Sequence, residues 1–417
     1  MPEQAVILCG GLGTRLRPLT DNIPKPMALV NGKPFLHHLI CQIRESGINS
    51  FILLTGYRGE MIREYFGTGE NLGVKINYDH GPVEWDTGRR LWEAQDKIAS
   101  SFLLLYSDNF AQFNLNRLLQ LHASCKNSVS LLLAPKEAGN IHLTADGLID
   151  SYDRTRSGNH LKYVELGYML VEKKKVLHEF PQCDGFPDIS FSAILERLAC
   201  QKQLAGLVVR DPYHSISDLK RLELMRQYLK PKKILLIDRD GTLNHKAPTG
   251  KYILSWQQFE FISDSLNAMK WLSDLGFHFI VITNQAGVAR NMLTAEELDD
   301  IHTKMISQLA FEGISVLKVY VSPHHWDENS YERKPQPGLF FKAAADFNLR
   351  MDRILYVGDD QRDCIAAANA GCGMVFLTQT DQQPDLAEYP RPFLQSPLLS
   401  CCKEQIASIY SNWEPSS

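Results

Sequence analysis

The chain has 417 residues, of which 44% are hydrophobic and 22% are charged, and its formal net charge is −4. Single hydrophobic cores stop growing near roughly 250 to 300 residues, so we expect two domains. The small negative net charge gives no reason to expect a polyanionic partner, and we predict that the protein does not bind nucleic acid.

Membrane and extracellular classes are also disfavoured. No apolar run approaches the roughly 20 residues that cross a bilayer, and we see no basic leader before the first apolar stretch. The nine cysteines are odd in number and scattered, with Cys401 and Cys402 the only close pair. We therefore expect a soluble, cytoplasmic protein with reduced cysteines and no membrane partner, in which an oligomer remains possible.

Apolar strand-type runs alternate with helical patterns in both halves of the chain, which predicts the α/β class. In the first half the expected elements are strands at 5–9, 51–55 and 102–106 and helices near 35–46, 88–98, 190–200 and 217–229. In the second half the expected strands lie within 234–238, 279–284, 316–322 and 354–360.

The lysine-rich linker KPKK at 230–233 marks the expected boundary, so we predict a first domain at 1–230 and a second at 231–380. Residues 381–417 include four prolines between 384 and 397, and we expect an irregular tail that ends in a short helix.

Four segments of the second half carry the groups that phosphoryl transfer to water requires: a nucleophile, an acid, a cation and donors for the phosphate oxygens. Asp238 and Asp240 follow a strand within DRDGT, Thr283 ends ITN, Lys334 lies in RKP, and Asp359 follows ILYVG. Carboxyl ends of parallel strands converge on one crevice, so we expect these side chains to meet. An aspartate after a strand is often only a turn or cap residue, so the prediction rests on the set.

DRDGT, ITN, RKP and GDD resemble the four motifs of the haloacid dehalogenase superfamily of phosphatases, which implies a doubly wound parallel sheet. IDRDGTLN, VITNQAGVAR, VSPHHW, ERKPQPG and VGDDQRD, within about residues 233–377, are similar to the heptose bisphosphate and histidinol phosphate phosphatase group. The resemblance implies that Asp238 is the nucleophile and Asp240 the general acid and base. It also implies that Asp238, the Asp240 carbonyl and Asp359 bind Mg²⁺.

The same resemblance implies that Thr283 and Lys334 hold the phosphoryl group and that Asn284 and Arg333 contact phosphate or substrate. Asp360 replaces a commonly basic residue, which could weaken phosphate contacts or alter magnesium binding.

A zinc loop of the pattern CxH and CxC often precedes RKP in this family. Ser322, Ser330 and Glu332 stand at the cysteine positions here and leave only His324. A lone histidine does not make a tetrahedral site, so we predict no zinc. We expect His324 and His325 to be loop-packing residues.

The first half begins with CGGLGTRLRPLT at 9–20 and PKPM at 24–27, a pattern that is neither GxGxxG nor a Walker loop. Glycines there let backbone amides approach a nucleotide, and Arg15 and Lys25 can neutralise triphosphate charge. The pattern therefore predicts a nucleotide cradle.

Over about residues 3–225 this half resembles the sugar nucleotidyltransferases, which implies a Rossmann-like fold with a mixed sheet. The residues that the resemblance assigns to the nucleotide loop are Gly10, Gly11, Gly13 and Thr14. It places Arg15 and Lys25 on the phosphates and makes Asp108 a ligand of Mg²⁺.

Further assignments by resemblance rest on position alone. Thr87 and Gly88 would contact the base, although a plain helix cap explains them equally well. Glu165 and Gly167 lie near sugar-contacting positions of the family. Asp153 and Arg154 lie near the place of a family Glu-Lys pair.

Ser215 stands where relatives usually have a second metal-binding aspartate. Asp211 or Asp218 could compensate, or the domain could transfer slowly or bind nucleotide without turnover.

Three hypotheses follow. The first is a bifunctional enzyme that hydrolyses the 7-phosphate of D-glycero-D-manno-heptose 1,7-bisphosphate and transfers a nucleotidyl group to heptose 1-phosphate. GTP is the favoured nucleotide, because the first half looks closest to the mannose and heptose 1-phosphate guanylyltransferases. The second gives the phosphatase histidinol phosphate as its substrate. In the third, the first half only binds nucleotide or nucleotide-sugar and regulates the phosphatase.

Overall fold

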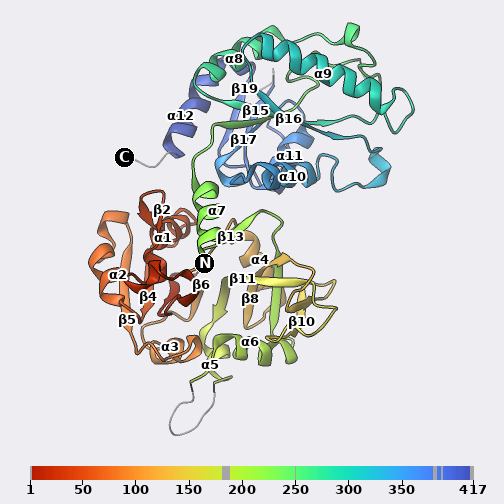
Figure 1. The fold of residues 1–417 in the computed structure, drawn as a ribbon. Coiled ribbons are helices and arrows are strands. Elements are labelled where there is room, and N and C mark those ends of the chain that lie inside the picture. Colours follow the sequence, from red (N-terminus) through yellow and green to blue (C-terminus); the bar gives the residue numbers. More distant parts are fainter. Residues whose placement is uncertain (1, 181–187, 249, 379–382, 387, 414–417) are drawn as a thin grey trace. The chain divides into compact units, whose positions relative to one another are not determined.

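The computed structural model describes residues 2–180, 188–248, 250–378, 383–386 and 388–413. The chain divides into two compact units, Met1–Leu229 and Lys230–Ser417. Each unit is a sheet with helices on both faces (Figure 1), which confirms the α/β class predicted from the alternating pattern.

The first unit is built on a mixed sheet. Its strands are β1 Ala5–Cys9, β2 Leu29–Val30, β3 Lys33–Pro34, β4 Ser50–Thr55, β5 Lys75–His80, β6 Ser101–Tyr106, β7 Asn109–Ala111, β8 Val129–Pro135, β9 Ile141–Leu143, β10 Leu148–Tyr152, β11 Tyr163–Glu172, β12 Leu204–Val208 and β13 Tyr213–Ser215. The main sheet has the order β5-β4-β1-β6-β11-β8-β12-β10-β9. Strands β5, β4, β1 and β6 run parallel, whereas β11 pairs antiparallel with β6 and β8. The parallel part has both faces covered and reads as continuous apolar runs for that reason.

The helices of this unit are α1 Phe35–Glu45, α2 Gly59–Phe66, α3 Thr87–Glu93, α4 Leu115–Cys125, α5 Lys173–Leu177, α6 Phe191–Cys200 and α7 Leu219–Leu229. The Ser190 side chain caps α6 by accepting from the Ala193 amide. Helix α3 ends at Glu93, short of the expected residue 98, because the Ala94 amide turns back onto the carbonyls of Arg90 and Trp92.

The second unit has a fully parallel sheet, as expected for a doubly wound fold. Its strands are β14 Ile234–Ile237, β15 His278–Asn284, β16 Val316–Ser322, β17 Leu355–Gly358, β18 Gly373–Leu377 and β19 Phe393–Ser396, and its helices are α8 Ser263–Asp274, α9 Ala295–Phe311, α10 Gly338–Phe347, α11 Gln361–Ala370 and α12 Lys403–Trp413. The order is β16-β15-β14-β17-β18-β19. Helices α8, α9 and α12 cover one face, and α10 and α11 cover the other (Figure 1).

The expectation of an irregular C-terminal tail was wrong, although the short final helix was expected. Strand β19 pairs in parallel with β18 at the edge of the sheet, and the prolines at 392 and 397 flank this strand without interrupting it. Helix α12 buries Ile406 and Tyr410, which are one turn apart. The Tyr410 hydroxyl accepts from the Leu355 amide at 3.1 Å and donates to the Ile234 carbonyl. The tail therefore completes the second core.

In the part of the chain that the structure describes, no helix combines the length and the apolar character that a membrane span needs.

We predict that Tyr410→Ala destabilises the second unit by about 3–5 kcal/mol, because it removes a buried ring and leaves a cavity. Tyr410→Phe keeps the ring and should cost about 1 kcal/mol for the lost hydrogen bonds. Urea unfolding followed by circular dichroism measures both. Tyr65→Ala, in the first unit where the ring is 48% exposed, is the matched control and should have little effect. Equal stability of Tyr410→Ala and wild type would contradict the core role of α12.

Candidate active sites

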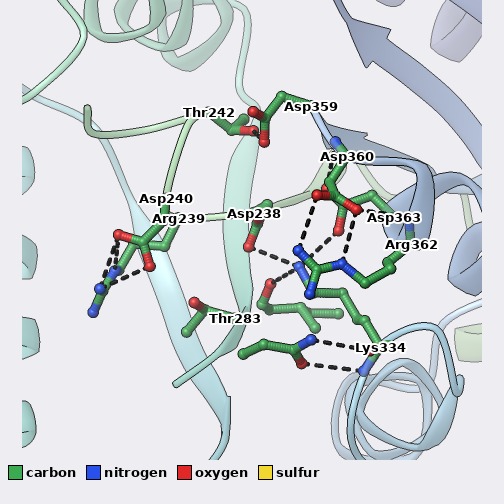
Figure 2. A network of polar contacts seen from close by, with 12 residues as sticks. Asp238, Arg239, Asp240, Thr242, Thr283, Lys334, Asp359, Asp360, Arg362 and Asp363 are labelled. Atoms are coloured by element: carbon green, nitrogen blue, oxygen red, sulfur yellow. Dashed lines mark hydrogen bonds and ion pairs between the residues drawn. The ribbon is translucent and has the colours of Figure 1, made fainter. Parts of the chain in front are cut away.

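The phosphatase motifs converge on a cavity of about 370 Å³ at the carboxyl ends of the parallel strands. Asp238 follows β14, Thr283 lies at the end of β15, and Asp359 follows β17. Asp238, Thr283 and Lys334 all line the cavity. Figure 2 shows Asp238 at the centre of the polar network, with Lys334 reaching it from one side.

The buried ammonium group of Lys334 joins two carboxylates of this site. Its Nζ lies 2.7 Å from Oδ1 of Asp238 and 2.8 Å from Oδ1 of Asp363, and all three residues are at least nine-tenths buried. Burial opposes the charge of Lys334, but Asp238 and Asp363 outweigh it and raise the lysine pKa. For Asp238 burial wins over the attraction of Lys334 and raises the pKa to about 7. Such perturbed groups in a cleft are typical of active sites.

Asp240 is held separately, by donors on its own side of the cavity. Both carboxylate oxygens accept from Nη2 of Arg239, at 2.9 and 2.8 Å, and Gln285 and Asn244 donate to it at 2.7 and 3.0 Å. Burial of Asp240 acts to raise its pKa, but Arg239 and these donors outweigh burial and lower it. Figure 2 shows the Asp240 carboxylate turned toward Arg239. The two aspartates thus have opposite pKa shifts, and without a bound cation these run against the roles expected from sequence, in which the nucleophile is ionised and the acid is protonated.

Asp359 faces the DRDGT turn. Its Oδ2 lies 2.6 Å from Nζ of Lys246, and Oδ1 accepts from the Thr242 hydroxyl at 3.5 Å. Gly241 has a φ of +91°, and a Cβ there would come within 2.4 Å of an Asp359 oxygen. The glycine of the motif is therefore required by both backbone conformation and space.

Three carboxylates could hold a cation here. One oxygen each from Asp238, Asp359 and Asp363 lies within 4.8 Å of the others. Hard oxygen donors of this kind fit Mg²⁺. Asp363 is a site residue that the sequence analysis did not assign. The available signal was its position four residues after Asp359, which places it in the first turn of α11 beside the strand end.

The remaining predicted residues of this site also line the cavity. Asn284 binds the main chain of Lys334 through both amide atoms, at 3.0 and 3.1 Å, and so holds the RKP loop. Arg333 donates from Nη1 to the His324 carbonyl at 3.1 Å. Asp360 caps α11 and pairs with Arg362 at 2.8 Å.

The loop that stands in place of the zinc loop is closed by hydrogen bonds. His324 Nδ1 lies 2.8 Å from a Glu328 carboxylate oxygen, and the His325 amide donates to the other oxygen at 2.7 Å. His325 forms a capping box with residues 326–328. Both histidines therefore lie in the local packing of the loop.

The second cavity, of about 460 Å³, lies in the first unit at the carboxyl ends of β1 and β6. The predicted residues that line it are Gly10, Gly11, Gly13, Thr14, Arg15, Lys25, Thr87 and Asp108. Lys25 Nζ lies 2.7 Å from Oδ2 of Asp108 and joins the PKPM segment to the end of β6. Gly13 has a φ of +63°, and a Cβ there would come within 2.8 Å of Lys25.

Arg90 is a further residue of this cavity that the sequence analysis did not single out. The residue is 4% exposed, and its guanidinium donates to the carbonyls of Thr55 and Pro82 at 2.8 and 2.6 Å. A Cβ on Gly10 would come within 2.3 Å of this guanidinium. Arg90 therefore fixes the loop that closes the cavity, and Gly10 makes room for it.

Several predicted contacts lie outside the lining of this cavity. The Gly88 amide donates to the Ile189 carbonyl at 3.0 Å. The neighbouring Asp86, which does line the cavity, provides the cap of α3. Glu165 accepts from Tyr152 and Asn140, at 3.0 and 3.3 Å, and Gly167 packs on Tyr106.

The proposed counterpart of a family Glu-Lys pair has local partners. Asp153 accepts from Thr155 and Ser157 in its own loop, and Arg154 pairs with Glu196 at 3.1 Å.

Ser215 lies beside Asp108, because β13 pairs with β7 and the Ile216 amide donates to the Asp108 carbonyl at 2.9 Å. The Arg221 guanidinium donates to the hydroxyls of Ser215 and Ser217, at 3.1 and 3.2 Å. Asp218 accepts from the Arg221 amide at 2.9 Å, and only Ser217 of this segment lines the cavity. Among the described residues, Asp108 belongs to no cluster of three acidic, histidine or cysteine side chains.

The fold and the two sites together define a class of two-domain α/β enzyme. Its first unit is of the nucleotidyltransferase kind, and its second is a phosphatase unit with a pair of aspartates. The family model for nucleotidyl transferases matches residues 4–142, and the model for polynucleotide kinase 3 phosphatases matches residues 233–382. The chain belongs to the nucleotidyltransferases through its first unit and to the haloacid dehalogenase superfamily phosphatases through its second.

Relatives of each unit are separate proteins. D-glycero-alpha-D-manno-heptose 1-phosphate guanylyltransferase of Aneurinibacillus thermoaerophilus is 37% identical over 211 residues, 49% of this chain and 89% of that protein. D-glycero-beta-D-manno-heptose-1,7-bisphosphate 7-phosphatase of Yersinia pestis is 34% identical over 153 residues, 35% of this chain and 80% of that protein. Other curated nucleotidyltransferases are matched over only 52% and 55% of their length.

Among solved structures, D,D-heptose 1,7-bisphosphate phosphatase from B. bronchiseptica, complexed with magnesium and phosphate, is 29% identical. It is matched with a TM-score of 0.39, over 42% of this chain and 98% of that one.

We predict that Asp238→Asn stabilises the metal-free protein at pH 8 by roughly 1–3 kcal/mol. A raised carboxyl pKa means that ionising Asp238 costs folding free energy. That cost is absent below the ordinary pKa of about 4, grows as pH rises toward the folded pKa of about 7, and is complete above it. Urea unfolding in the presence of a chelator should therefore show that Asp238→Asn raises the free energy of unfolding, relative to wild type, by more at pH 8 than at pH 5. The same change at both pH values would contradict this account.

Proposed function

We propose that the chain performs two consecutive steps of heptose activation. The second unit would hydrolyse the 7-phosphate of D-glycero-D-manno-heptose 1,7-bisphosphate, and the first would transfer a nucleotidyl group, with GTP favoured as donor, to the heptose 1-phosphate. The observation that carries this proposal is the pairing of the two units. One relative of the second unit is named as the 7-phosphatase of D-glycero-alpha-D-manno-heptose 1,7-bisphosphate, and removal of that phosphate leaves the alpha heptose 1-phosphate for which a guanylyltransferase related to the first unit is named. A single chain would then hold both catalysts.

In the hydrolysis, an Asp238 oxygen attacks phosphorus while the bond from phosphorus to the sugar oxygen breaks. Asp240 gives that oxygen a proton and takes one from the water that later cleaves the aspartyl phosphate. Lys334 and Thr283 lie where they can contact the phosphoryl oxygens. Mg²⁺ bound by the carboxylates of the cluster at Asp238 and Asp359 would supply positive charge against the phosphate.

The charge of the cavity favours a sugar bisphosphate over histidinol phosphate. Lys251, Arg290 and Arg333 line it, and within the described part of the chain none of the three forms an ion pair. The Arg290 guanidinium lies 5.7 Å from the rings of both Tyr252 and Trp326. Uncompensated cations in the cavity suit a second phosphate group, whereas they would repel the ammonium group of histidinol phosphate.

For the nucleotidyl transfer, the glycine-rich loop, Arg15 and Lys25 would bind the triphosphate, so that an oxygen of the sugar phosphate displaces pyrophosphate at the α-phosphorus. The Asp108 carboxylate is an oxygen donor suited to Mg²⁺, which would neutralise phosphate charge. The alternative, a unit that binds nucleotide without turnover, draws on Ser215, which gives Asp108 no second carboxylate. We favour transfer, because the loop, Lys25 and Asp108 meet at one cavity.

Paired assays should separate the two activities. Asp238→Asn should abolish phosphate release from heptose bisphosphate and leave intact pyrophosphate release from GTP with heptose 1-phosphate. Asp108→Ala should do the reverse, since each residue serves one cavity. Both anomers and all common nucleoside triphosphates should be offered. Wild-type protein that binds GTP but never yields pyrophosphate would favour the binding alternative.

Arg290→Gln should raise KM for the bisphosphate roughly tenfold or more, because a charge-assisted hydrogen bond is worth about 1.5–3 kcal/mol. KM for p-nitrophenyl phosphate, which has no second phosphate, should change less than about twofold on the same reasoning. Steady-state kinetics measure both, and Lys270→Gln, a surface lysine paired with Glu312 on the second unit, is the control. Faster turnover of histidinol phosphate than of the bisphosphate would overturn the substrate assignment.

A further inference from the structure

Arg239, the residue between the two aspartates of DRDGT, is one of the largest fully buried side chains of the protein, with an exposure of 1%. Its Nε and Nη2 groups donate to the Asp240 carboxylate, at 2.8 to 3.2 Å. On its other side, Nη1 lies 3.1 Å from Nε2 of His302. The Phe259 ring lies 6.0 Å from the guanidinium carbon. The guanidinium is therefore held between a carboxylate and an imidazole.

The chemistry of these groups determines how His302 is protonated. Arginine has only donors, so the Nε2 atom that receives the Nη1 hydrogen must carry a lone pair, and the proton of the imidazole must be on Nδ1. His302 lies in α9 and is 5% exposed. Burial and the neighbouring Arg239 lower its pKa to about 3, so the ring is neutral. His302 thus acts as a hydrogen-bond acceptor and carries no charge.

An acceptor at this place is needed for the orientation of Arg239. Without it, a buried N–H of the guanidinium would lose its partner, at a cost of about 1–3 kcal/mol or more for a charged group. The guanidinium would then turn toward another acceptor and release its grip on Asp240. Asn244 and Gln285 also donate to Asp240, but neither is charged. The position of the Asp240 carboxylate therefore depends on a contact made from helix α9, outside the DRDGT turn.

The geometry points to His302 as a positioning residue that acts through Arg239 to hold the Asp240 carboxylate at the cavity, where it can transfer a proton to the leaving oxygen once it has been protonated. This inference rests on the proposed phosphatase function, in which the bond from Asp238 to phosphorus forms while the phosphorus–ester bond breaks. The ester oxygen leaves as an alcohol if Asp240 supplies the proton and as an alkoxide if it does not. His302 itself does not line the cavity.

Leaving-group dependence tests this role without requiring the natural sugar. A nitrophenolate leaves without a proton, whereas less acidic phenols need one. Against a series of substituted phenyl phosphates, log kcat/KM should fall more steeply with leaving-group pKa in His302→Leu than in the wild type. We expect a loss of roughly tenfold or more for the poorest leaving group, within the range that general acid catalysis supplies, and less than about threefold for p-nitrophenyl phosphate.

His302→Gln keeps an acceptor and should retain the wild-type slope. Arg239→Met, which removes the donors while keeping an unbranched apolar chain, should reproduce the steep slope even if His302→Leu folds poorly. A uniform loss of kcat/KM across the series in His302→Leu and Arg239→Met would show that His302 is only a packing residue and would overturn the inference. An unchanged slope in these two variants would overturn it as well. Wild-type protein that fails to hydrolyse p-nitrophenyl phosphate would instead overturn the proposed phosphatase function.

Discussion

Parallel strand pairing is the constraint on which both sites depend. In the first unit β1 and β6 run side by side in the same direction, and Gly10 and Asp108 follow their carboxyl ends at one edge. In the second unit β14 lies between β15 and β17, so the residues after these strands meet although they are far apart in sequence. The apolar strands are covered by helices on both faces, which leaves the strand ends as the place where polar groups can gather.

The phosphatase site is built from buried charges in pairs. Lys334 lies between Asp238 and Asp363, and Arg239 joins Asp240 to His302. A buried charge that is left without any partner costs about 3–5 kcal/mol. Lys334 keeps Asp363 when Asp238 is neutral, whereas the Arg239 charge is compensated by Asp240. The arrangement gives two neighbouring aspartates opposite pKa shifts, because one is mainly desolvated while the other receives a buried guanidinium. Stability and chemistry are therefore coupled at Asp238, where the ionised form is unfavourable for folding.

Prediction from sequence succeeded where local pattern and topology agree. Residues that directly follow apolar strands, such as Asp238, Asp359 and Asp108, were found because a strand end and a polar residue are both visible in the chain. Arg90 and His302 were missed, since each lies within a helix and its role depends on which loop or neighbouring side chain it meets. The C-terminal segment was misjudged because its prolines suggested irregular structure, whereas Pro392 and Pro397 border a strand that pairs with β18.

The amino-acid order alone was enough to recognise two α/β units and to predict a nucleotide loop and an aspartate pair, because these features consist of short-range patterns of hydrophobicity, glycine and charge. Only the folded chain revealed that Asp363 joins the carboxylate cluster, that Arg221 contacts Ser215, and that Arg239 is supported from α9. Such contacts join residues on separate elements. Hydrogen bonds and ion pairs act over about 3 Å in space, and only tertiary packing brings those atoms together.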